Sequence, residues 1–152
     1  MLYDNQSGTT FTVWKVPIEG GTPVQLTNEY SRMPAVSLDG QFIACRYLAE
    51  GSSREIAIFP FAGGAPIERL PIPVMDWQKV QWMPEGRALT YIDAVKGVSN
   101  IWRYDLGTRS ARQLTDFKTE RIFAYAWSPD FKWLACLRGT ESRDVTVINN
   151  QP

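Results

Sequence analysis

The sequence contains no histidine, and this absence excludes the most common catalytic and metal sites. Histidine is the usual general base of serine and cysteine hydrolases and the most frequent zinc ligand, so neither site can be built in its ordinary form. Cysteine is nearly absent too, since only Cys45 and Cys136 occur. Two cysteines cannot form a disulfide framework, and we expect both to be small buried side chains that lie too far apart to bond.

Long apolar runs and an excess of one charge are also missing. No apolar stretch approaches the roughly 18 residues needed to cross a bilayer. Sixteen Lys and Arg residues balance sixteen Asp and Glu residues, so no net positive field attracts nucleic acid or anionic lipid. We therefore expect no nucleic-acid partner and no membrane insertion of this segment. The 44% of hydrophobic residues predicts a globular core.

An internal repeat organises the residues that are present. One kind of block is an apolar stretch, a glycine-containing turn and a short run with a leucine near its end, at 13–27, 56–71 and 101–115. The other is a pair of apolar stretches joined by a turn, at 35–47, 81–93 and 126–138. The blocks alternate with a period of about 43 to 46 residues. That length suits four short strands with their turns and is typical of one propeller blade.

The composition of the blocks indicates strands rather than helices. Short runs rich in Val, Ile, Phe, Tyr and Trp are stopped by Pro, Gly and Asp and lack helical spacing. The sequence therefore predicts an all-β fold, a β-propeller segment of four-stranded antiparallel blades, with two complete blades and two partial ones. The expected boundaries are a partial blade at 1–27, blades at 33–71 and 78–115, and a partial blade at 122–150 that includes a strand at 145–150.

Several repeated residues are interpreted as structural. The stretch 42–47 is nearly all apolar, as expected for a strand covered on both faces. Three carboxylates share one turn position, where a side chain can hold the turn by bonding to the backbone, namely Asp39, Glu85 and Asp130. Four aromatic residues are expected to pack between blades, namely Trp14, Trp82, Trp102 and Trp127. Replacing a buried Trp127 by alanine is expected to cost about 3 to 5 kcal/mol.

The last repeat resembles the TolB-like, tricorn-type propeller repeat, a relative of WD repeats. Its segments AWSPDFKWLAC (126–136) and NIWRYDLGTRSARQLT (100–115) match a pattern of W-S-P-D-G, I-W-x-x-D and Q-L-T, apart from Phe131 in place of glycine. The copies at 35–45 and 81–91 depart further from the pattern, and the resemblance covers nearly the whole chain. It implies the C-terminal part of a larger bacterial propeller protein, in a periplasmic or extracytoplasmic compartment.

The candidate partner-binding residues lie near the loops that enter each repeat, because function in such folds lies in loops at one face. They are large residues of types enriched at binding hot spots, namely Tyr30, Arg32, Trp77 and Arg121. We expect these side chains to contact a protein or peptide ligand. The alternative is that each one packs against its own loop.

The sequence favours a non-catalytic binding module that serves as the sensor or scaffold part of a larger protein. No catalytic residue, metal site or cofactor is predicted, and Ser128 lies in no Gly-x-Ser-x-Gly elbow. The alternative is the gating propeller of a prolyl-oligopeptidase-type serine peptidase, whose catalytic domain would lie elsewhere. A third possibility, an enzyme using carboxylates inside the ring, predicts a polar central channel. The missing blades are expected from the rest of the propeller or from another copy of the chain.

Overall fold

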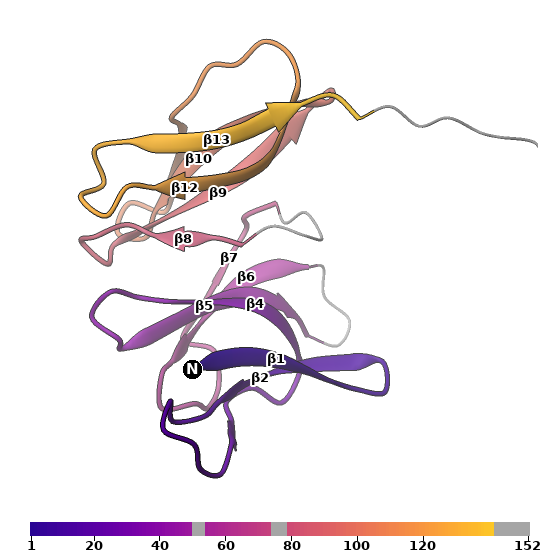
Figure 1. Ribbon diagram of the computed structural model, residues 1–152, viewed down its shortest axis with the longest axis vertical. Helices are drawn as coiled ribbons and strands as arrows, with labels where there is room; N and C mark the ends of the chain where they lie inside the picture. Colours follow the sequence, from indigo (N-terminus) through magenta and orange to yellow (C-terminus); the bar gives the residue numbers. More distant parts are fainter. Residues whose placement is uncertain (50–53, 74–78, 142–152) are drawn as a thin grey trace, which may run out of the picture.

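The computed structural model describes residues 1–49, 54–73 and 79–141. These residues form strands grouped into four antiparallel sheets, which follow one another along the long axis of the molecule (Figure 1). Within the described ranges, no segment forms a helix of the length and hydrophobicity that a bilayer crossing requires. The expected all-β propeller segment is confirmed.

Two complete sheets lie between two smaller ones. The second sheet contains β4 (Tyr30–Val36), β5 (Phe42–Leu48), β6 (Glu55–Pro60) and β7 (Glu68–Leu70) in chain order. The third sheet contains β8 (Gln81–Trp82), β9 (Ala88–Val95), β10 (Val98–Asp105) and β11 (Ser110–Gln113), again in chain order. Each sheet is therefore a simple up-and-down meander, in which β4 and β8 form one edge and β7 and β11 the other.

The first and last sheets have fewer strands among the described residues. The first contains β1 (Leu2–Ser7), β2 (Thr10–Lys15) and β3 (Val24–Gln25). The last is a hairpin of β12 (Arg121–Trp127) and β13 (Leu134–Gly139). By repeat position, β12 corresponds to β4 and β8, and we call these three the inner strands. The strand expected at 145–150 lies outside the described residues.

Three apolar clusters fill the spaces between consecutive sheets. The cluster between the first and second sheets contains Val13, Leu26, Ile43, Cys45, Tyr47, Ala57 and Phe59. The cluster between the second and third contains Ala44, Ile56, Ile58, Leu70, Ile72, Val80, Trp82, Leu89, Tyr91 and Tyr104. The smallest, between the third sheet and the hairpin, contains Ile92, Ile101 and Ile122. Burying one such aliphatic side chain contributes about 1.5 to 3 kcal/mol, so these junctions hold the stack together.

Strand β5 is covered on both faces, as its continuous apolar run predicts. Ile43, Cys45 and Tyr47 face the first sheet, whereas Ala44 faces the third. All four side chains are at most 3% exposed. The alternation of side chains along a strand places neighbours in different clusters, so one strand contributes to two junctions.

The repeated Gln-Leu-Thr run has a specific backbone role. Thr27 accepts the backbone N–H of Val13 at 2.9 Å through its side-chain hydroxyl, and Thr115 accepts the N–H of Ile101 at the same distance. The amide of the preceding Gln25 donates to the carbonyl of Thr27 at 2.7 Å. The threonine hydroxyl thus continues the hydrogen-bond ladder past the end of the short last strand of a blade. It takes the place of a strand carbonyl as the acceptor for the N–H of Val13 or Ile101.

The turn between the first two strands of a blade is held by its aspartate. Asp39 accepts a hydrogen bond from the Ser37 hydroxyl at 2.5 Å and another from the Gln41 N–H at 3.0 Å. Asp130 accepts the same two kinds of bond, from the Ser128 hydroxyl at 2.5 Å and the Lys132 N–H at 3.2 Å. The structural interpretation of both aspartates is confirmed.

Glu85 occupies the same turn position but acts differently. Its carboxylate accepts a hydrogen bond from the Arg103 guanidinium at 2.6 Å, on the neighbouring strand β10. Residue 83 in this copy is Met83, so the hydroxyl that serves the aspartates in the other two turns is absent. The longer glutamate side chain instead reaches a cation across the sheet.

The tryptophans and cysteines are less uniform than their repeat positions suggest. Trp82 is buried, at 5% exposed, and its indole N–H donates to the carbonyl of Ala35 at 2.9 Å. Trp127 is only half-buried, so the expectation of a buried side chain is wrong for this residue. Both cysteines are free, and Cys45 is buried, which raises the pKa of its thiol to about 12. Cys136 is half-buried, since the last hairpin is covered on one face only.

Candidate functional site

Two of the predicted binding residues contact the neighbouring sheet instead of pointing freely into a loop. The Arg32 guanidinium pairs with Asp4 of β1, with 3.1 Å between Nε and Oδ2, and lies 4.0 Å from the centroid of the Phe11 ring. The Tyr30 ring meets Phe11 edge-on at 6.0 Å. The hydrogen bond to Asp4 raises the pKa of Arg32 above its already high value. Both residues therefore join β4 to the first sheet.

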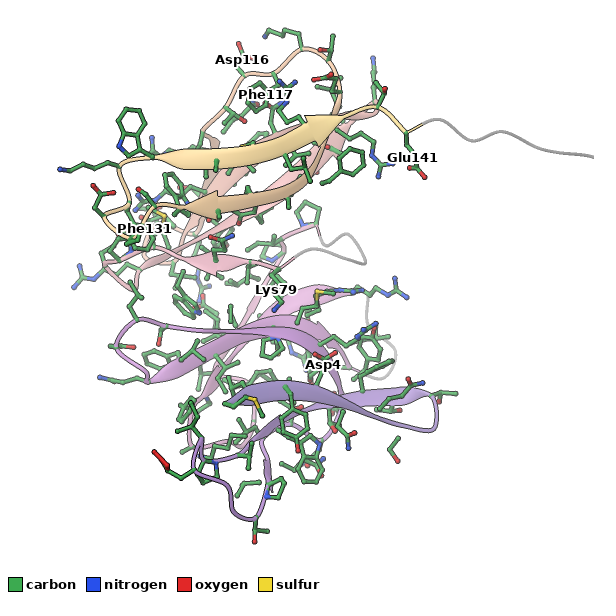
Figure 2. All side chains as sticks on the ribbon, in the orientation of Figure 1. Asp4, Lys79, Asp116, Phe117, Phe131 and Glu141 are labelled. Carbon is green, nitrogen blue, oxygen red and sulfur yellow. The ribbon has the colours of Figure 1, made fainter. Side chains whose placement is uncertain are left out.

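A third predicted residue, Arg121, does not join this group. Arg121 begins β12, two sheets farther along the stack, and its guanidinium pairs with Glu141 at 3.1 Å. Figure 2 shows Glu141 at the end of the hairpin, far along the molecule from Asp4. Trp77 lies outside the described residues. The three predicted residues that the structure describes, Tyr30, Arg32 and Arg121, thus do not form one surface.

A cavity that sequence reasoning missed lies where the three inner strands meet. Its volume is about 270 Å³. Strands β4, β8, β9 and β12, together with the residues just before β8, supply its lining, which comprises Met33, Lys79, Gln81, Ile92, Phe123, Ala124 and Tyr125. Figure 2 shows Lys79 between the second sheet and the layers that follow it. Residues from three successive repeats therefore converge on one hollow.

The backbone on both sides of the cavity departs from regular strand geometry. The pairing of β4 with β5 shifts register between Arg32 and Ala35, and the pairing of β12 with β13 shifts between Ile122 and Ala124. Within the first irregularity, Met33 has a φ of 56°, which is unfavourable for a residue with a Cβ. Bulges of this kind re-aim side chains and are frequent next to binding sites.

Hydrogen bonds between sheets fix the walls of the cavity. The Gln81 amide donates to the carbonyl of Tyr125 at 2.8 Å, and the Tyr125 hydroxyl donates to the carbonyl of Thr90 at 2.6 Å. Burial raises the pKa of the Tyr125 hydroxyl far above its ordinary value, so it stays protonated and remains a donor. The inner strand β12 is thereby tied to β8 and β9, and this wall is held in a defined position.

Two lining side chains are left for contact with another molecule. The Phe123 side chain is 38% exposed. Lys79 is exposed, and no carboxylate in the described ranges forms an ion pair with its ammonium group. Among the described residues, the lining thus combines an apolar surface from Met33 and Phe123 with the positive charge of Lys79.

The chemistry of the lining suits binding. None of the described lining residues carries a carboxylate or a thiol, and the Tyr125 hydroxyl is already bonded to Thr90. Across the described ranges, no group of three His, Cys, Asp or Glu side chains is placed to hold a metal ion. The aspartates Asp39 and Asp130 are engaged in their own turns, where the Ser37 and Ser128 hydroxyls lower the pKa of each carboxyl.

The sequence gives only a weak signal for this site, because no lining residue belongs to a recognisable motif of the repeat. Lys79 lies at the start of the middle repeat, just before β8, and Phe123 belongs to the last one. They come together only because successive blades place their inner strands side by side. A search of each repeat for non-repeating residues at the start of its inner strand would have found Met33 and Phe123.

Solved propeller structures share this fold at low sequence identity. TolB from Acinetobacter baumannii is similar with a TM-score of 0.74 and 22% identity, over 89% of this chain and 34% of that one. A putative TolB from Agrobacterium tumefaciens has a TM-score of 0.66 and 20% identity, over 90% of this chain and 53% of that one. The β-propeller domain of the Trilobed protease from Pyrococcus furiosus has a TM-score of 0.53 and 15% identity, over 81% and 41% of the two chains.

The chain has the β-propeller fold, and the expected likeness to TolB-like propellers is confirmed at the level of the fold. It spans about a third of the Acinetobacter TolB chain and about half of the Agrobacterium one. No protein-family model matches the sequence, and no curated protein matches it either.

Proposed function

We propose that this β-propeller segment is a non-catalytic binding module, and that the cavity at its inner strands takes an apolar side chain of a protein or peptide. A carboxylate next to that side chain in the ligand pairs with Lys79. The observation that carries the proposal is that Lys79, whose ammonium forms no ion pair with any described residue, and the exposed Phe123 lie on the lining of one cavity.

The size of the cavity favours a side chain over a free metabolite. Sites for small molecules are commonly about 300 to 1,000 Å³ and surround most of the ligand. At about 270 Å³ the cavity accommodates one large side chain, while the rest of the ligand lies along the inner strands. A protein or peptide supplies such a side chain with additional contacts on either side.

The charge at the cavity supports an acidic partner. Lys79 is the only charged residue among the described lining residues. An ammonium group beside an apolar surface attracts a carboxylate more strongly than one fully surrounded by water, because nearby protein lowers the effective dielectric. The side chains of Tyr30 and Arg32 contact Phe11 and Asp4 of the first sheet, so the proposed ligand contacts come from the cavity residues.

Peptide titration tests the proposal. The probe is an acetylated, fluorescently labelled peptide of alternating leucine and glutamate, compared with peptides in which glutamine or lysine replaces glutamate. We expect the glutamate peptide to bind most tightly, and Lys79→Gln to weaken it about tenfold, the effect of removing one charge pair of about 1.4 kcal/mol. Phe123→Ser should weaken all three peptides.

The matched control is Lys132→Gln, which removes another exposed lysine, from a turn that does not line the cavity. It should leave peptide affinity unchanged. Binding that is equal for the three peptides, or that resists both Lys79→Gln and Phe123→Ser, contradicts the proposal. Absence of binding by the folded chain contradicts it as well.

The second candidate is the gating propeller of a serine peptidase. The similarity to the propeller domain of the Trilobed protease supports it, at the level of the fold. This role requires an α/β-hydrolase domain on the same polypeptide, with a Gly-x-Ser-x-Gly elbow and a histidine. Sequencing the gene on both sides of this segment distinguishes the candidates, because the binding-module proposal needs no such domain.

A further inference from the structure

The last hairpin exposes an apolar face at one end of the stack. Trp133 is 75% exposed and Leu137 is 64% exposed. Ala135 lies between them and is exposed too. Because side chains alternate along a strand, Ala135 and Leu137 share one face of β13, and Trp133 just before the strand lies on the same side. Leu134 and Cys136 face the third sheet.

The repeats show what covers this face elsewhere in the chain. The counterparts of Ala135 and Leu137 in the second and third sheets are Ala44, Arg46, Thr90 and Ile92. None of these four is more than 2% exposed. In both sheets the following blade provides the cover, and Trp127 of the following blade donates its indole N–H to the Thr90 hydroxyl at 3.2 Å. The face of β13 is therefore a blade-docking face.

The opposite end of the stack presents the complementary face. On the first sheet Tyr3 pairs across the strands with Trp14, as Tyr91 pairs with Trp102 on the third sheet. The Tyr91 and Trp102 side chains pack into the cluster that covers Ala44 of the preceding blade. A Tyr–Trp pair is thus part of the apolar surface that packs on such an alanine within the chain. The first sheet carries a second copy of that pair.

We propose that a second copy of this chain docks its first sheet on the last hairpin, with the Tyr3–Trp14 pair covering Ala135 and Leu137. The face offered by β13 is more apolar than its counterpart in the second sheet, where Arg46 takes the place of Leu137. Apolar surface of this kind drives association when it is removed from water. The contact joins two different faces, so copies assemble head to tail and close into a ring or extend into a filament.

Sedimentation velocity of the whole chain over about a hundredfold range of concentration tests the proposal, because head-to-tail contacts populate larger species by mass action. We expect the average mass to rise with concentration. Leu137→Lys blocks the hairpin face and Tyr3→Lys blocks the first-sheet face, and each variant alone should sediment as a monomer. Val95→Lys, at a 62% exposed residue at the end of β9, is the control that should still associate.

Mixing the two blocked variants separates head-to-tail docking from other modes of association. In the mixture, the Tyr3→Lys chain keeps its hairpin face and the Leu137→Lys chain keeps its first-sheet face. We therefore expect dimers that contain one chain of each variant, and nothing larger. Circular dichroism checks that both variants retain the strand spectrum. A wild-type chain that stays monomeric, association that survives either substitution, or a mixture that stays monomeric overturns the proposal. The outcome does not depend on the Lys79 cavity, which lies on the inner strands.

Discussion

Phe131 stacks against Trp127, with 6.2 Å between the ring centroids and 29° between the ring planes, although its backbone φ is 56°. The corresponding turn residues are glycines, and Gly40 and Gly86 have φ values of 71° and 66°. The left-handed region costs a residue with a Cβ about 1 to 2 kcal/mol. The ring contact offsets part of that cost, so Phe131 keeps the positive φ that glycine has at this turn position in the other two repeats.

Comparing Phe131→Gly with Phe131→Ala measures the backbone strain at this turn. Both variants lose the ring contact, but only glycine relieves the positive φ, so we expect Phe131→Gly to be more stable by about 1 kcal/mol. Urea denaturation gives the two free energies of unfolding. At the matched position, Gly40→Ala should lose a similar amount, since no atom lies within 4 Å of the added Cβ. Equal stabilities of the two Phe131 variants would mean that the turn changes conformation.

Trp82 and Trp127 occupy the same repeat position but should differ in energetic importance. We expect Trp82→Ala to cost about 3 to 5 kcal/mol, because the ring is buried between two sheets. Trp127→Ala should cost about half as much, because that ring is only half-buried. Replacing each by phenylalanine keeps most of the apolar contact and isolates the indole hydrogen bond. A larger cost at Trp127 than at Trp82 would contradict the burial pattern.

The turn aspartates make stability depend on acid pH. Hydrogen bonds from the Ser37 hydroxyl and the Gln41 N–H lower the pKa of Asp39 below 3.8, and those from the Ser128 hydroxyl and the Lys132 N–H do the same for Asp130. A carboxylate with a lowered folded-state pKa stabilises the fold above its unfolded pKa, and this contribution is lost as pH falls through the folded value. We therefore expect thermal stability to decline below about pH 4, and to decline less in the Asp39→Asn, Asp130→Asn double variant.

Arg32 should act on stability rather than on ligand binding. A double-mutant cycle of Arg32→Ala and Asp4→Ala should give a coupling energy of about 0.5 to 1 kcal/mol, since both side chains are about one-third exposed and water screens the pair. Phe11→Leu should remove the cation–π contact separately. The peptide affinity of Arg32→Ala should equal that of the wild type, and a loss comparable with that of Lys79→Gln would place Arg32 in the binding surface.

The sequence predicts those parts of the structure that depend on local pattern. The continuous apolar run of β5 indicates burial on both faces, and the turn position of Asp39 indicates its backbone contacts. The cavity was not predictable in this way, because Lys79 and Phe123 belong to different repeats and meet only through stacking. The contacts of Arg32 within the chain were not predictable for a related reason. Its partner Asp4 lies on another sheet, at a position where the corresponding residues in the later repeats are Arg46 and Ile92.

The arrangement of one apolar cluster at each junction makes the molecule a linear array of layers. Coupling then extends only from nearest neighbour to nearest neighbour, and denaturation begins with fraying at the terminal layers. The cavity is an exception, since its walls come from β4, β8 and β12 and so belong to three layers at once. A ligand side chain bound in this cavity contacts three layers at once. It therefore couples the unfolding of these layers to one another.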